Sequence, residues 1–226
     1  MYRLIPNRYL FLVLAWLVLG ILYIVVKAHE IFGTGERWSS VPAWAWVALN
    51  LLLLNPIWRF FWKVIPPLRR WFPDLNGSWD VKLESNWARH KQVIAAAKSE
   101  IPAIDIQTCP EEELAPLTPI SLRAEIRQTW WSFEMRLTNP RTDSPLKRSD
   151  VIILEPFAGK GLRPPTVCYF YKQENATDNV SDDNEFFGAA RLTYDADCDR
   201  LEGVAWTARM WRRAMNTAAA ISFTRA

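Results

Sequence analysis

The feature that most limits how this chain can fold is an unbroken apolar segment close to its start. Residues 9–26, YLFLVLAWLVLGILYIVV, carry no charge, and a helix of that length crosses about 30 Å of hydrocarbon. A signal peptide would have a shorter apolar core, and the following KAHEIF offers no small-residue cleavage site. The sequence therefore predicts an uncleaved membrane anchor.

A second apolar run, residues 41–62, is less regular because it contains Asn50, Asn55, Pro56 and Arg59. Tryptophans lie at both of its ends, as they do where transmembrane helices meet the two membrane interfaces. We interpret this run as a second span. The Asn50 amide would then seek a hydrogen-bond partner, either on the first span of the same chain or on another copy.

Charge is divided unevenly along the 226 residues. The part up to Trp71 has eight basic and two acidic residues, a net charge of +6, whereas the remainder carries −3. Basic residues flank the two spans on the same side (Arg3, Arg8, Arg59, Lys63, Arg69, Arg70). By the positive-inside tendency both termini are cytoplasmic and the loop 27–40 is outside. The acidic remainder is not a DNA- or RNA-binding domain.

From residue 74 onward the apolar period is two, which is typical of half-buried strands. Strands are predicted at residues 76–84, 120–126, 133–137, 149–156, 165–173, 187–194, 200–207 and 217–225, and a short helix at 89–98. About eight antiparallel strands can close into a barrel, with a sandwich as the alternative. The fold expected is therefore two N-terminal transmembrane helices (domain 1–73) followed by an all-β domain, an antiparallel barrel of about eight strands (domain 74–226).

Residues suited to catalysis are scarce. The chain has two histidines, His29 and His90, and three cysteines without close spacing, which leaves no material for a triad, a metal site or a disulfide framework. The loop FAGKGLRPP lacks the spacing of a phosphate-binding P-loop. The acidic runs 111–113 and 182–185 are expected to be solvated. We predict a protein that is not an enzyme and has no metal and no cofactor.

The stretch LEGVAWTARMW, residues 201–211, ends a predicted strand with chemistry that a plain strand does not need. By strand parity Thr207 and Arg209 share a face with Gly203 at the open end of the barrel, and Trp206 takes the other face. A guanidinium pairs with phosphate, and an aromatic face can stack on a base. The alternative is a surface ion pair for Arg209, with Trp206 and Trp211 as packing.

Two further aromatic residues enter the site prediction as stacking surfaces, Tyr169 and Trp79. The segment NGSW that carries Trp79 also resembles the opening of lipocalin-type barrels, in which this tryptophan plugs one end. The predicted ligand-binding residues are thus Arg209, Thr207, Trp206, Tyr169 and Trp79.

Together, the two spans, LNGSW, IRQTWWSFEMRL and LEGVAWTARMW…TAAAISFTR resemble the two-transmembrane β-barrel effectors of bacterial CBASS anti-phage systems. The closing pattern of that family is approximately G-x-Y-W-T-N-R, followed by a final strand ending in arginine. Gly203, Trp206, Thr207, Arg209, Ile221 and Arg225 match it. Ala205 and Ala208 replace the tyrosine and the asparagine.

The resemblance implies an anti-phage defence effector in the bacterial inner membrane. Its barrel would bind a cyclic dinucleotide made by a partner nucleotidyltransferase, after which copies would form a homo-oligomer, disrupt the lipid bilayer and kill the infected cell. Two other classes remain open. One is a membrane-anchored, lipocalin-like carrier of a small hydrophobic ligand, and the other is a structural adaptor with a filled barrel.

Overall fold

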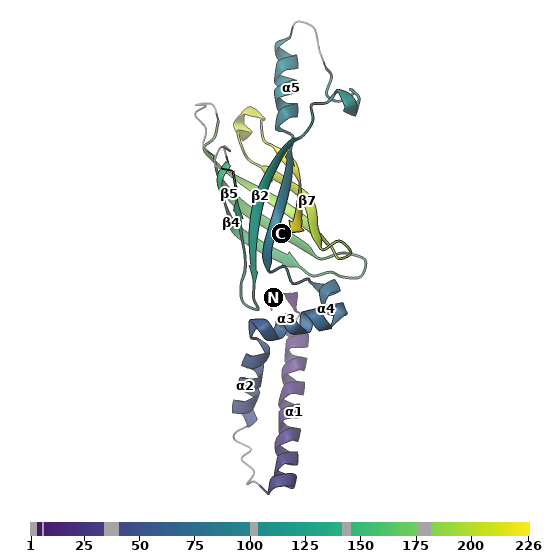
Figure 1. The fold of residues 1–226 in the computed structure, drawn as a ribbon, viewed down its shortest axis with the longest axis vertical. Helices are drawn as coiled ribbons and strands as arrows, with labels where there is room; N and C mark the ends of the chain where they lie inside the picture. Colours follow the sequence, from purple (N-terminus) through teal and green to yellow (C-terminus); the bar gives the residue numbers. More distant parts are fainter. Residues whose placement is uncertain (1–3, 6, 34–40, 100–103, 142–145, 176–181) are drawn as a thin grey trace. The chain divides into compact units, whose positions relative to one another are not determined.

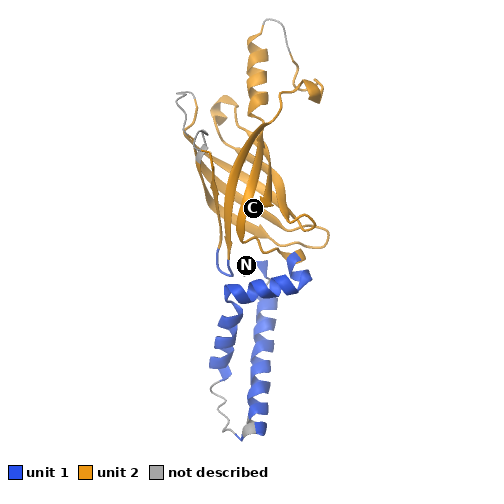
Figure 2. Ribbon diagram, in the orientation of Figure 1, with its two compact units in different colours: residues 1–69, 129–132 blue, residues 70–128, 133–226 orange. Residues whose placement is uncertain are grey.

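The computed structural model describes residues 4–5, 7–33, 41–99, 104–141, 146–175 and 182–226, and the chain divides into two compact units (Figures 1 and 2). Unit 1 comprises residues 1–69 and the turn 129–132, and unit 2 comprises residues 70–128 and 133–226. Arg3 and residues 34–40, on which the predicted topology partly depends, lie outside the described residues.

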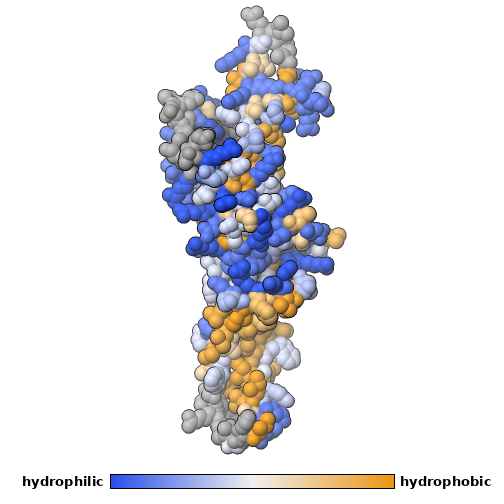
Figure 3. Space-filling view, viewed as in Figure 1, coloured by the Kyte–Doolittle hydropathy of each residue, from blue (hydrophilic) through white to orange (hydrophobic). Residues whose placement is uncertain are grey.

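Unit 1 is built on a long apolar helix, α1 (Asn7–Phe32), with α2 (Val41–Leu52) packed against it. Apolar side chains cover most of the visible surface of these two helices (Figure 3). Within the described part of the chain, α1 is the one helix that is long and apolar enough by itself to cross a membrane. The chain is therefore suited to membrane anchoring through its N-terminal segment.

The second predicted span is two helices rather than one. After α2 the chain passes through Leu53 and Leu54 and starts α3 (Asn55–Val64), with a bend of 67° between the two helix axes. Pro56 lies in the first turn of α3. It has no N–H to donate to a preceding turn, so a helix continuing from α2 would lose a hydrogen bond there and clash. Proline at the start of a new helix carries no such cost.

The Asn50 amide has a partner that the sequence does not predict. Its Nδ2 donates to the carbonyl oxygen of Trp46 at 2.8 Å, one turn earlier in α2 itself. The amide thus has a local partner in α2 instead of the one predicted on α1, and a bond to a second copy stays a prediction.

Unit 2 is a closed antiparallel barrel in which each strand pairs with the next and β8 returns to β1, so the barrel prediction is confirmed over the sandwich. The strands are β1 (Gly77–Ser85), β2 (Thr118–Gln128), β3 (Phe133–Thr138), β4 (Leu146–Phe157), β5 (Thr166–Asn175), β6 (Glu185–Asp195), β7 (Arg200–Thr207) and β8 (Ala218–Arg225). The predicted short helix is α5 (Trp87–Lys98), which follows β1 directly. A short helix, α4 (Pro66–Trp71), contains the boundary between the units.

Two ends of the barrel can be distinguished by the chain path. At one end β1 leads into α5, and β7 leads through a loop into β8; we call this the α5 end (Figure 1). At the other end, the Trp79 end, Trp79 is fully buried and its Nε1 donates to the Leu75 carbonyl at 2.9 Å. The Arg225 guanidinium lies 4.1 Å over the Trp79 ring and donates to the carbonyls of Asp74 and Asn76.

Candidate ligand-binding site at the α5 end of the barrel

Strand parity places the β7 residues as the sequence predicts up to the end of the strand. Leu201 and Ala205 are buried, whereas Glu202, Val204 and Trp206 face outward. Thr207 ends the strand opposite Gly188 of β6. The Thr207 hydroxyl lies 2.8 Å from the hydroxyl of Thr217 and accepts the backbone N–H of Arg209. These bonds hold together the two sides of the loop that joins β7 to β8.

Gly188 is required by its neighbour on the inside of the barrel. A Cβ atom at this position would collide with the ring of Tyr171, which fills the space beside it. Tyr171 in turn packs against Tyr169, with ring centroids 5.6 Å apart. Burial raises the pKa of Tyr171 to about 12 and raises the pKa of Tyr169 as well, because the phenolate would lose its hydration. The predicted stacking residue Tyr169 is 4% exposed and lies enclosed in the barrel core.

Arg209 is held by a carboxylate that the sequence does not single out. Its Nε donates to Asp182 Oδ1 at 2.8 Å and its Nη2 donates to Asp182 Oδ2, a two-point pairing. The guanidinium also lies 4.4 Å over the ring of Trp87, the first residue of α5. The Arg209 side chain is 20% exposed and that of Asp182 is 8% exposed. Three segments thus meet at Arg209.

The prediction that the acidic run 182–185 is solvated is wrong for Asp182 and Asp183 and is confirmed for Glu185, whose side chain is 58% exposed. Asp182 is buried against Arg209, and Asp183 accepts the backbone N–H of Met210 at 2.6 Å. Met210 has a left-handed backbone (φ 48°), an uncommon conformation for a residue with a side chain. The Asp183 bond holds this residue in place. By contrast, Glu111 in the other acidic run is 84% exposed, as expected.

The turn at Met210 directs the next residues out of the barrel wall. Trp211–Arg213 form a single 3-10 turn that ends at Ala214, also left-handed (φ 54°). Trp211 is 63% exposed, and Arg212 and Arg213 are exposed as well. Among the described residues neither of these two arginines forms an ion pair, although Arg212 lies 5.5 Å from the Trp211 ring centre. Both arginines therefore present exposed side chains at this turn.

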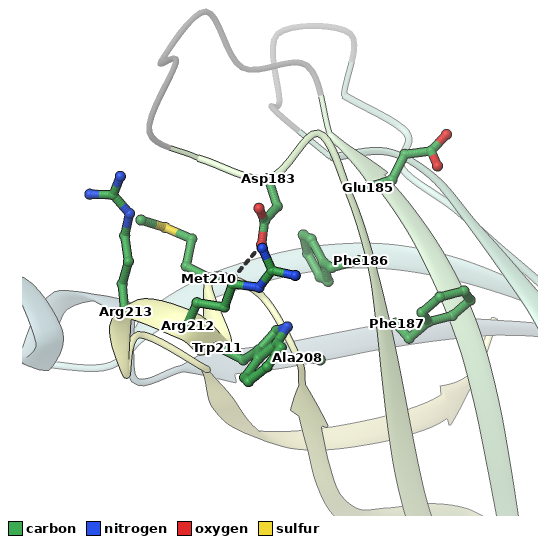
Figure 4. Close-up of a pocket in the computed structure, with 9 residues that line it drawn as sticks. All are labelled: Asp183, Glu185, Phe186, Phe187, Ala208, Met210, Trp211, Arg212 and Arg213. Atoms are coloured by element: carbon green, nitrogen blue, oxygen red, sulfur yellow. Dashed lines mark hydrogen bonds between the residues drawn. The ribbon is translucent and has the colours of Figure 1, made fainter.

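A cavity of about 380 Å³ lies beside this turn (Figure 4). Trp211 and Arg212 point toward the strand that carries Phe186 and Phe187, and Arg213 points away from it (Figure 4). The cavity is lined by Asp183, Glu185, Phe186, Phe187, Ala208, Met210, Trp211, Arg212 and Arg213. Aromatic and cationic groups therefore meet in one open groove, which we call the Arg212 groove.

The structure does not bring all five predicted site residues together. Thr207 and Arg209 border the loop that forms the Arg212 groove, but Trp79 lies at the opposite end of the barrel with its ring covered by Arg225. Trp206 is on the outer face and 49% exposed. The strand pattern does not predict Phe187, Met210 and Arg213 as lining residues. Of these, Arg213 has a signal in the sequence, because it belongs to the run WRR just beyond the strand.

The outer face that carries Trp206 is itself apolar. Cross-strand pairing aligns Ile153 of β4, Phe170 of β5, Ala189 of β6 and Trp206 of β7 in one row. Phe187 stacks on Phe170 with ring centroids 5.4 Å apart and planes within 12°. Single exposed apolar residues are ordinary, but a contiguous exposed row is typical of an interaction surface. We call it the outer aromatic row.

The fold and the site define a class of protein, a closed barrel with an N-terminal membrane-type helix and a groove of arginine and aromatic side chains. No family model matches the chain. A comparison with known proteins finds CD-NTase-associated protein 15 of Escherichia albertii, which is 28% identical over 173 residues, 75% of this chain and 70% of that protein. The chain thus has a distant relative, and the name of that relative associates the relative with a CD-NTase.

Proposed function

We propose that this protein is a membrane-anchored effector of a bacterial CBASS anti-phage system and that its barrel senses a cyclic dinucleotide. The name of the relative supports the association with a nucleotide-making CD-NTase. The apolar α1 supports membrane anchoring, and the closed barrel provides a separate folded unit for sensing. In this scheme the partner nucleotidyltransferase makes the ligand and the barrel binds it.

The observation that carries the ligand class is the Arg212 groove. A cyclic dinucleotide presents two phosphates and two bases, which suit guanidinium groups and aromatic faces respectively. Arg212 offers a guanidinium that points toward β6, Arg213 offers a second one at the border of the groove, and Trp211 offers an exposed face beside Arg212. A carrier of a hydrophobic molecule would need an apolar cavity instead, and the groove is bordered by four charged residues.

Arg209 has a different part in this proposal. The Nε and Nη2 groups of Arg209 already donate to Asp182, so a phosphate could bind these two groups only by displacing that carboxylate. We therefore assign direct phosphate contact to Arg212, and to Arg209 and Thr207 the positioning of the loop that carries it. Ligand contact by Arg209 remains a prediction that depends on exchange with Asp182. Trp79 and Tyr169 serve as core packing in this scheme.

Self-association is assigned to the outer aromatic row. Trp206 and Phe170 leave this row exposed on the barrel, where a second copy could cover it. Ligand binding in the adjacent groove would order the β7–β8 loop next to Trp206 and so favour contact between copies. Gathered copies would concentrate their membrane helices and disrupt the bilayer.

The test is calorimetric titration of the full chain in detergent with cyclic dinucleotides, using the matching linear dinucleotides as controls. We expect at least one cyclic dinucleotide to bind at least ten times more tightly than its linear form. Sedimentation should then show larger assemblies in the presence of that ligand, and Trp206→Ser should reduce assembly without reducing binding. Failure of all cyclic dinucleotides to bind, together with tight binding of a fatty acid, would favour the carrier. Binding of neither would favour the adaptor.

A further inference from the structure

The helix α3 differs from α1 and α2 in how its side chains are distributed. Residues spaced at helical intervals give it one apolar face, formed by Ile57, Phe60, Phe61 and Val64. The opposite face carries Asn55, Arg59 and Lys63, which are four residues apart. Among the described residues, Phe60 is 61% and Val64 57% exposed, Phe61 is 38% exposed and Ile57 is half-buried, so the apolar face is uncovered mainly at Phe60 and Val64.

The tryptophans of α3, Trp58 and Trp62, lie between these two faces and are buried. Trp58 donates to Asn55 Oδ1 at 3.0 Å and meets Trp62 edge-on at 5.5 Å. Trp62 in turn meets the ring of Trp130, in the turn that belongs to the same unit, at 5.9 Å. The tryptophans thus hold the helix in place through their ring contacts, whereas Phe60 and Phe61 remain exposed.

The end of α3 is built as a true helix terminus. Arg69 donates to the carbonyls of Trp62 at 3.1 Å and Lys63 at 3.2 Å, in the last turn, where an α-helix supplies no N–H of its own to the carbonyls. A cation at this position also complements the helix dipole. With the bend of 67° before it and this cap behind it, α3 is an independent helix of ten residues.

We propose that α3 is an interfacial helix that lies in the plane of the bilayer surface. Its apolar face enters the boundary between headgroups and acyl chains, and Arg59 and Lys63 reach the phosphates of anionic lipids. An amphipathic helix with a basic polar face is the form that such helices take. The occupant is lipid because α3 begins only two residues after α2, so it starts wherever the apolar α2 leaves the bilayer. This goes beyond nucleotide sensing, and its failure would leave the proposed function standing.

The arrangement can be tested by placing nitroxide labels on the full chain in liposomes of phosphatidylcholine and phosphatidylglycerol. Cys109, Cys168 and Cys198 are first replaced by serine, and single cysteines are introduced at each position from 57 to 64. Collision with oxygen reports lipid exposure, and collision with a nickel chelate reports water exposure. Leu14→Cys in α1 serves as the deep control and Ser121→Cys on the outside of β2 as the aqueous control.

We expect oxygen contact to peak at positions 57, 60, 61 and 64 and chelate contact to peak at 59 and 63. The four apolar positions should share one shallow depth, about 5–10 Å below the headgroups. A depth that changes steadily along 57–64 would show the second half of a membrane span and overturn the proposal. Protection of Phe60 and Val64 from both reagents would also overturn it, because a protein partner would then cover the face.

The lipid charge is tested separately. Replacing phosphatidylglycerol with phosphatidylcholine, or introducing Arg59→Gln with Lys63→Gln, should reduce oxygen contact at position 64 by about twofold or more, because the attraction to the anionic surface is lost. Lys27→Gln, near the end of α1, also removes a cation and is the charge control; it should change nothing at position 64. Equal contact in both lipids and in the double variant would overturn the role of the two cations.

Discussion

Arg209 and Arg212 lie three residues apart and should respond to truncation in opposite ways. Arg209 is held by Asp182 and Trp87, whereas Arg212 stands in the groove without an ion-pair partner among the described residues. Arg209→Ala should therefore lower the stability of the barrel, and Arg212→Ala should lower its affinity for a cyclic dinucleotide. Each variant serves as the matched control for the other.

The size of each effect follows from burial. Removing one partner of a buried ion pair costs about 3–5 kcal/mol, and because the Arg209 side chain is 20% exposed we expect about 2–4 kcal/mol. For a domain of this size that lowers the melting temperature by roughly 5–15 °C. Loss of a charge-assisted hydrogen bond by Arg212→Ala costs about 1.5–3 kcal/mol, a 10- to 150-fold loss of affinity.

The assays are thermal melting and calorimetric titration of both variants, together with Arg209→Lys and the double variant Arg209→Ala/Asp182→Ala. The double variant should recover part of the lost stability because it removes the stranded carboxylate. Arg209→Lys should rescue stability only in part, because lysine keeps the charge but loses the two-point pairing. An Arg209→Ala barrel of unchanged melting temperature with greatly weakened binding would refute this reasoning and identify Arg209 as the phosphate contact.

Three further predictions follow from unit 2 and from the anchor. A fragment beginning at Arg70 should be more stable than one beginning at Asp74 by about 3–5 kcal/mol, because the latter loses the fully buried Phe72; urea unfolding of both fragments checks this. The pKa of Tyr171 is raised to about 12, so the folded barrel favours the neutral phenol. The neutral phenol therefore contributes fully to the free energy of unfolding below the unfolded pKa near 10, and this contribution is lost as the pH rises toward 12. Stability should fall by up to about 1.4 kcal/mol per pH unit in that window, and Tyr171→Phe should remove this share of the fall. A reporter fused after Ala226 should be cytoplasmic, and a periplasmic reporter would contradict the predicted topology.

The strand pattern predicts most of the barrel because a period of two leaves little choice of which face is buried. Trp79, Val81, Leu122, Ala124 and Ile126 all lie inside as their alternation indicates. The irregularity in β4 between Val151 and Ile153 was not predicted, since a bulge changes the pairing of one residue and leaves the local composition unchanged.

The sequence predicts one helix over the apolar run 41–62 because the break does not alter the apolar composition of the run. Asn55, Pro56 and Arg59 were the signals for an end and a new start, and they do not reduce the apolar content enough to stand out. The consequence is physical. The helix α2 has 12 residues, about 18 Å at 1.5 Å per residue, which is shorter than the roughly 30 Å hydrocarbon core. The bend of 67° after this short helix thus rules out a single straight helix over 41–62.

The candidate site shows where strand parity stops being informative. Parity assigns faces only while the chain stays extended, and β7 ends at Thr207, two residues before Arg209. The partner that captures Arg209 is Asp182, 27 residues earlier in the chain, where nothing in the local sequence distinguishes it from a solvated acid. Trp211 and the two arginines after it reach the surface because Met210 and Ala214 adopt left-handed backbones. A guanidinium near a strand end is therefore not by itself a ligand contact, because its availability depends on which carboxylates the other loops bring to it.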